Sequence, residues 1–210
     1  MLARLQQGLE RLYRIETRAS VEDFLIDAEL RERLGVERAP REQLLVTHDE
    51  DGLSVGLFVD EEALSNLAAH DPADRLDERN LGDFLLAVEG VSHFVYLTWR
   101  AHHDHRVSAL ELELQAEVDK YVTCLLCEGS GEAGRSAALR RRLFEQFSFE
   151  DGLDEDERDR YRVANANAHR YSASLERRFV RVGRISGMLA ELRRFYRLPL
   201  GGKLDLIRAA

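Results

Sequence analysis

The stretch VSALELELQAEVDKYVTCLLC, residues 107–127, decides between a helical and a β-rich fold. Its first half alternates apolar residues with acidic ones, which is typical of a strand. Ser108 and Glu111, however, have the spacing of a capping box at the start of a helix. Val107 and Leu112 have the spacing of a hydrophobic staple, and beyond them the apolar residues recur at helical steps. We therefore predict a helix here and a mainly helical fold.

The one clear β signal lies upstream, in QLLVTHDEDGLSVGLFV, residues 43–59. Apolar residues alternate along its second half, and Asp51-Gly52 is a typical pair for a tight turn, so we predict a β-hairpin. The apolar run 94–97, FVYL, leaves two alternatives open. It could add a third strand beside the hairpin, or it could continue a helix as far as Arg100.

Amphipathic periodicity predicts helices on both sides of these segments. We expect Ser20 and Asn80 to cap two of them. The predicted helices span residues 2–18, 20–35, 61–70, 80–90 or 80–100, 107–127, 137–149, 154–180 and 185–195, with a short helix after Pro199. The predicted fold class is α+β, predominantly α-helical, with a multi-helix core and a β-hairpin or a small three-stranded sheet. We expect one domain over residues 1–210, with a soft division near 129–134.

Composition excludes several classes of protein. With 44% hydrophobic and 33% charged residues, the chain is too apolar to be disordered and too charged for a membrane bundle. We find neither a spanning apolar stretch nor the apolar block of a signal peptide, and two cysteines cannot form a disulfide framework. We therefore expect a cytoplasmic protein that does not bind membranes. All basic residues except Lys120 and Lys203 are arginine, which suggests a GC-rich, bacterial genome.

Cys124 and Cys127 have the CxxC spacing of many zinc sites, and His102, His103 and His105 precede them. If the residues between the two groups are helical, a rise of 1.5 Å per residue separates the groups by roughly 20 Å or more. Ligands of one zinc ion lie within about 2.3 Å of it. The helix prediction therefore argues against a shared zinc site.

Carboxylates and histidines recur at helical spacing in two predicted helices. Glu89 and His93 are four residues apart, as are Glu113 and Glu117, so each pair shares one helix face. His169 is a possible further contributor. Together these residues could hold a divalent metal ion inside a helical bundle, as the cofactor of a metal-dependent enzyme.

A simpler interpretation is open for the same residues. The spacing of Glu89 and His93 differs from the Glu-x-x-His of ferritin-like metal sites. Lys120 follows Glu117 by three residues and could neutralise it in an ordinary surface pair. On this interpretation the glutamates are solvated charges.

Charge is divided unevenly along the chain. Residues 158–210 carry 13 basic and four acidic side chains, a net charge of +9, whereas the first 157 residues carry −18. The cluster Arg193, Arg194 and Arg197 could bind an acidic protein partner or nucleic acid, or the basic helices could pack against the acidic half of the same chain.

The sequence contains none of the established catalytic motifs that we sought, which favours a protein that is not an enzyme. The function that we expect is that of a cytoplasmic accessory or adaptor protein, acting through protein–protein contacts in a larger assembly and without a cofactor. The competing hypotheses are the metal-dependent enzyme and an arginine-rich nucleic-acid accessory factor.

Overall fold

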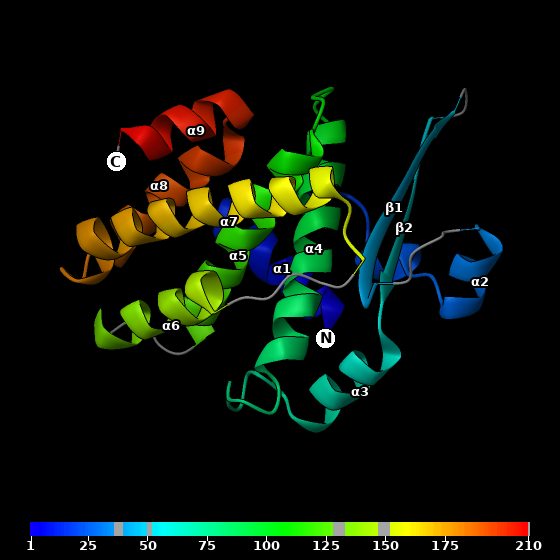
Figure 1. Cartoon of the computed structure of the whole chain (residues 1–210), viewed down its shortest axis with the longest axis horizontal. Helices are drawn as coiled ribbons and strands as arrows, with labels where there is room; N and C mark the ends of the chain where they lie inside the picture. Colours follow the sequence, from blue (N-terminus) through cyan, green and yellow to red (C-terminus); the bar gives the residue numbers. More distant parts are fainter. Residues whose placement is uncertain (36–39, 50–51, 128–132, 147–151, 210) are drawn as a thin grey trace.

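The computed structural model describes residues 1–35, 40–49, 52–127, 133–146 and 152–209. Most of these residues are helical, and a two-stranded antiparallel hairpin lies at one side of the helices (Figure 1). The predicted class, predominantly helical α+β, is confirmed. The described elements are α1 (Leu2–Tyr13), the 3₁₀ helix η1 (Val21–Phe24), α2 (Ala28–Arg33), β1 (Glu42–Asp49), β2 (Gly52–Val59), α3 (Glu61–Ala69), α4 (Leu81–Ala101), α5 (Ala109–Cys127), α6 (Ala133–Glu145), α7 (Glu155–Leu175), the π-helix η2 (Glu176–Val180), α8 (Ile185–Arg197) and α9 (Leu200–Arg208).

The helix α4 lies at the centre of the molecule, with α5 beside it and α7 crossing in front (Figure 1). The hairpin, α1 and α3 also pack against α4. Val91, Phe94 and Tyr96 are therefore fully buried, although they point to different sides of the helix. This explains why residues 91–99 are apolar nearly all round. No described helix is both long and apolar enough to span a bilayer.

The helix predicted over 107–127 is confirmed as α5. Its N-terminus is capped by Ser108, whose Oγ accepts a hydrogen bond from the Glu111 amide at 3.2 Å. The alternation of leucine and glutamate at the start of α5 resembles a strand because acidic side chains occupy buried positions of this helix. Glu111 and Glu113 are buried, whereas Leu112 is only partly buried.

The predicted hairpin is also confirmed. The two strands pair in register from Glu42 opposite Val59 to Asp49 opposite Gly52, and residues 50 and 51 of its turn lie outside the described residues. The third-strand alternative for residues 94–97 is wrong, since they belong to α4. The edge of β2 that does not pair with β1 is instead contacted by Ile26, whose amide donates to the Leu57 carbonyl at 2.9 Å.

The helix predicted over 20–35 is wrong as a single element. Residues 25–27 are not helical, because Leu25 forms an isolated parallel bridge with Leu57 of β2. Pairing with the sheet thus splits the segment into η1 and α2. Ser20 makes no capping hydrogen bond, and Asp27 caps α2 by accepting from the Leu30 amide at 2.7 Å.

Asn80 does not cap α4 as predicted. Its side-chain amide donates to the carbonyls of His70 and Arg75, at 3.0 and 2.7 Å, and so holds the loop between α3 and α4. The helix α4 continues through Gly90 to Ala101, so the longer of the two predicted helices, 80–100, is confirmed.

Several helices begin or end at other residues than predicted. The first helix ends at Tyr13, because Arg14 adopts a left-handed conformation. The helix predicted over 137–149 begins earlier, at Ala133, and ends at Glu145, and residues 147–149 lie outside the described residues. Most of the predicted soft division near 129–134 also lies outside them, since 128–132 are not described.

Candidate metal centre

Four carboxylates and one imidazole meet where the start of β1 packs on α4, next to α5. Glu89 and His93 come from α4, Glu113 and Glu117 from α5, and Glu42 from the first position of β1. His93 stands between two of the carboxylates: its Nε2 is 3.5 Å from Glu113 Oε2, and its Nδ1 is 3.6 Å from Glu42 Oε1. We call these five residues the carboxylate site.

Within this site, one ligand atom each from Glu89, His93 and Glu113 lie within 4.8 Å of one another. Bonds of about 2.0–2.2 Å from a metal to oxygen or nitrogen place the ligands of a tetrahedral ion about 3.3–3.6 Å apart. Movements of under about 1 Å by each atom would therefore bring the three atoms around one ion. No other group of this kind exists in the part of the chain that the structure describes.

One nitrogen of the His93 ring, Nε2, is buried and makes no hydrogen bond. The residue as a whole is 6% exposed. The facing oxygen of Glu42, Oε1, is also buried without a hydrogen bond. Burial by itself lowers the pKa of His93, but the nearby Glu113 and Glu42 outweigh it and hold the pKa well above its usual value.

Lys120 joins the two helices at the edge of the site. Its Nζ lies 2.8 Å from Glu117 Oε1 and 2.6 Å from Glu89 Oε2. The predicted pair with Glu117 is therefore present, but its surface location is wrong, since both side chains are at most 15% exposed. Burial lowers the pKa of Lys120, but Glu117 and Glu89 outweigh burial and raise it well above its usual value.

Negative charge exceeds positive charge in the carboxylate site. Burial raises the pKa of Glu42 and of Glu117, which disfavours the ionised forms. Burial acts on Glu89 in the same way, but Lys120 and His93 outweigh it and lower the pKa of Glu89. Four largely buried carboxylates beside one ammonium group and one imidazolium leave negative charge that either protons or a bound cation must neutralise.

The carboxylate site opens into a pocket of about 910 Å³. The pocket is walled by β1, α4, α5, α6 and α7, and all five residues of the site line it. Apolar side chains such as Leu44 and Leu112 alternate with polar ones such as Asn165. This mixed lining and the volume are typical of a small-molecule site.

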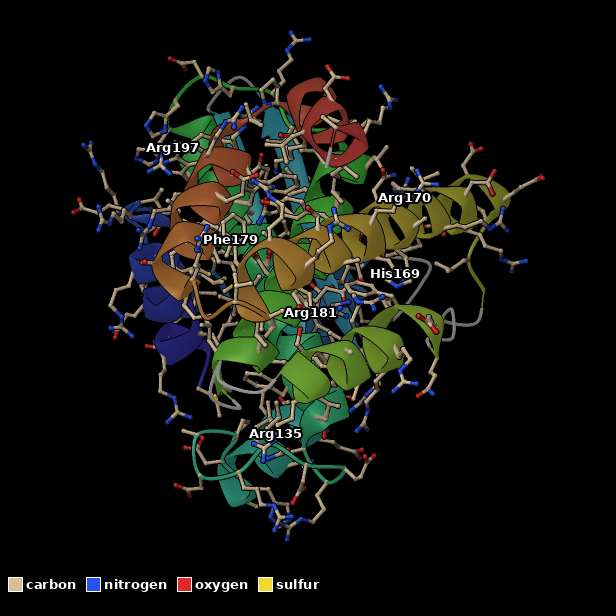
Figure 2. All side chains as sticks on the ribbon, turned by 90° about the vertical axis from the view of Figure 1, so that its left-hand side faces the viewer. Arg135, His169, Arg170, Phe179, Arg181 and Arg197 are labelled. Atoms are coloured by element: carbon tan, nitrogen blue, oxygen red, sulfur yellow. The ribbon has the colours of Figure 1, made fainter. Side chains whose placement is uncertain are left out.

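His169, the fifth predicted ligand, lies elsewhere. It faces α6 from α7 (Figure 2), where its Nε2 is 3.5 Å from Glu145 Oε1 and contacts Arg140. Its ring stacks on Phe144 with centroids 5.6 Å apart. The structure therefore brings together four of the five predicted residues and leaves His169 in a separate contact.

Glu42 was missed by sequence reasoning, although one signal was available. Side chains alternate between the two faces of a strand, so Glu42 shares a face with Leu44 and Val46. All three line the pocket. A carboxylate on the apolar face of a strand therefore pointed to the interior.

A second buried polar network, also not predicted, lies deeper between α1, α4, α5 and α9. Asp119 accepts hydrogen bonds from Ser92 at 2.6 Å, from Gln115 at 2.9 Å and from Tyr13. Lys203 donates to Gln115 Oε1 at 2.8 Å. Burial raises the pKa of Asp119 to about 6 and lowers that of Lys203 to about 7. Because every member has a partner, the network connects the helices without leaving a free group.

The arginine cluster predicted to bind a partner lies on α8. Arg193 donates to the Leu12 carbonyl at 2.8 Å, and Arg197 donates to the carbonyls of Tyr13 and Arg14 at 3.0 and 3.1 Å. Arg194 is exposed. Two of the three arginines thus hold the C-terminus of α1, and binding of a partner stays a prediction.

Comparison with known proteins adds no identity: no family model, curated protein or solved structure matches the chain. Its function must therefore be inferred from the geometry of its sites.

Proposed function

We propose that the protein is a metal-dependent enzyme that holds a divalent transition-metal ion with Glu89, His93 and Glu113. The observation that supports this most directly is the buried Nε2 of His93, which has no hydrogen bond and faces a carboxylate at 3.5 Å. A buried polar atom without a hydrogen bond is costly, and a metal ion would satisfy it.

Glu42 has the place of an orienting residue. A histidine that binds a metal commonly donates its other ring N–H to a carboxylate, which fixes the tautomer and the ring orientation. Glu42 lies on the Nδ1 side of His93, at 3.6 Å, so Nε2 is the nitrogen left for the ion. Lys120, at 2.6 Å from Glu89, would hold that ligand from the other side.

The pocket favours a catalytic site over a structural one. Three protein ligands leave at least one coordination position free, and catalytic metal sites use this position for water or substrate. Because the carboxylate site lines the 910 Å³ pocket, a ligand there could reach the ion. No comparable observation supports the adaptor function, which stays a prediction.

Metal binding can be tested on purified protein treated with EDTA. We expect calorimetry with Mn²⁺ and with Zn²⁺ to show one ion per chain, and His93→Gln and Glu113→Gln to abolish binding. Glu42→Gln should weaken it by about 10–100-fold. The matched control is His169→Gln, which should bind as the wild type does.

A second measurement tests whether the bound ion keeps a coordination position open to water. Mn²⁺ that keeps an exchangeable water accelerates the relaxation of solvent protons, so we expect the bound ion to enhance this relaxation. If neither ion binds stoichiometrically to folded protein, the metal site is refuted. If Mn²⁺ binds without enhancing relaxation, the site is closed and the enzymatic proposal fails while the metal site stands.

A further inference from the structure

A second surface depression lies away from the carboxylate site, between the end of α1, the end of α4 and α8. Its volume is about 960 Å³. We call it the arginine groove, after the basic residues that line it: Arg11, Arg14, Arg18, His102, His103 and Arg197. Residues from three separate parts of the sequence thus meet there. One of them, Arg197, is labelled in Figure 2.

The positive charge of the groove is only partly neutralised by the residues that the structure describes. Among the described residues, the side chains of Arg11, Arg14 and Arg18 have no hydrogen bond or ion pair. Arg197 donates only to backbone carbonyls. This contrasts with the exposed Arg4 and Arg41, which are paired with aspartates, in a chain whose net charge is −9.

Two acidic residues also line the groove. Glu10 already accepts two hydrogen bonds from Thr17, whose amide and hydroxyl donate to Glu10 Oε1 at 3.1 and 2.6 Å. Glu16 is exposed. Four guanidinium groups therefore exceed two carboxylates, and one of those carboxylates is already held by hydrogen bonds.

Crowding of the cations is visible at the neighbouring Arg193. Its pKa is lowered, first by burial and then by the positive charges of Arg14 and Arg197. Repulsion of this kind is relieved when an anion binds among the cations.

The loop that carries two of the arginines is held rigidly. Gln6 is buried, and its Nε2 donates to Thr17 Oγ1 at 2.8 Å and to the Ala19 carbonyl at 2.7 Å. Arg14 and Arg18 have φ values of 53° and 58°, which residues other than glycine rarely adopt. Such backbone is kept only where the surroundings enforce it, and it is concentrated at functional sites. The groove is therefore formed before any ligand arrives.

We propose that the arginine groove binds a small anion that carries two or more phosphate groups. Guanidinium groups bind phosphate through paired N–H donors, and a volume of about 960 Å³ suits a small molecule. The rings of Trp99 and His103, with centroids 4.9 Å apart and planes inclined by 48°, supply an aromatic part of the wall. A long nucleic acid fits less well, because the protein as a whole carries a net charge of −9 and repels an extended polyanion.

Inorganic tripolyphosphate is a suitable probe, used with EDTA-treated protein at constant ionic strength. We expect calorimetry to show one saturable site and the melting temperature to rise. The double variant Arg14→Gln/Arg18→Gln should weaken binding by about tenfold for each arginine, or about 100-fold in all. The matched control is Arg170→Gln, which removes an exposed arginine on α7, apart from Arg197 in Figure 2.

The outcomes separate this proposal from its alternatives. An unchanged melting temperature without ligand shows that the double variant folds, so a loss of binding is then due to the lost charges. Absence of saturable binding to wild type, or equal binding by the double variant, overturns the proposal. Tight binding of a 20-nucleotide RNA without binding of tripolyphosphate assigns the groove to nucleic acid instead. His93→Gln should bind tripolyphosphate normally, so this site can fail independently of the metal site.

Discussion

Lys120 on α5 lies 2.6 Å from Glu89 on α4, and both side chains are largely buried. The same ammonium nitrogen lies 2.8 Å from Glu117, so one cation holds two carboxylates of the carboxylate site. A buried ion pair adds little net stability compared with apolar residues, but removing one partner leaves an uncompensated buried charge. Lys120 therefore links the two central helices and reduces the negative charge of the carboxylate site, where a metal ion would bind.

Lys120→Met should lower the free energy of unfolding by about 3–5 kcal/mol, because Glu89 and Glu117 then lose their shared cation. Urea denaturation measures this change. The control is Arg208→Gln, which removes an exposed pair with Asp205 and should cost at most about 1 kcal/mol. A similar small loss for Lys120→Met would mean that the two glutamates are protonated in the folded protein.

Gly90→Ala should destabilise the protein, although alanine favours helices. A Cβ at this position would lie 3.0 Å from the Glu42 side chain and 3.1 Å from Leu57 Cδ1. Overpacking of this kind costs about 1–3 kcal/mol, against a gain in helix propensity of about 1 kcal/mol. We also expect weaker metal binding, since Glu42 must shift from its place beside His93.

Gly82→Ala is the matched control on the same helix. Nothing lies within 4 Å of its added Cβ, so this variant should be stabilised by up to about 1 kcal/mol. Thermal and urea denaturation compare the two variants directly. Equal stabilisation of both would contradict the close approach of the hairpin to α4.

Lys203 should give the protein a pH-dependent stability in the alkaline range. Burial lowers its pKa to about 7, whereas the unfolded chain keeps the ordinary value of 10.5. The unfolded state therefore binds more protons above pH 7, and the free energy of unfolding rises with pH in this window. Relative to Lys203→Met, wild type should gain about 3 kcal/mol between pH 7 and about pH 9.5.

The measurement is urea denaturation of both proteins across that range. The difference between them should be constant below pH 7 and grow above it. Parallel curves would show that Lys203 keeps its charge, held by Gln115 at 2.8 Å and by the Tyr96 ring at 4.1 Å.

Ser108→Ala should cost about 1 kcal/mol, because the Glu111 amide loses its acceptor at the start of α5. Ser108→Asp should be nearly neutral, since a carboxylate accepts the same hydrogen bond and suits a helix N-terminus. Ser65→Ala, at an exposed position inside α3, should be neutral or slightly stabilising. Equal effects of the two alanine variants in chemical denaturation would argue against the cap.

Local patterns in the sequence were sufficient wherever neighbouring residues decide the structure. The cap at Ser108 acts within the first turn of α5, and the alternation over 53–59 reflects the pleat of one strand. The same local periodicity placed Glu89 with His93, and Glu113 with Glu117, on common helix faces. Four of the proposed site residues followed from spacing alone.

Only the tertiary structure decided which of these side chains meet and whether water reaches them. Packing of β1 on α4 brings Glu42 to His93, and pairing of Leu25 with Leu57 breaks a segment whose periodicity is helical. Arg14 and Arg197 share a groove although 183 positions separate them. Spacing along an element fixes direction over a few residues, whereas burial and charge balance depend on contacts between distant segments, which no local pattern encodes.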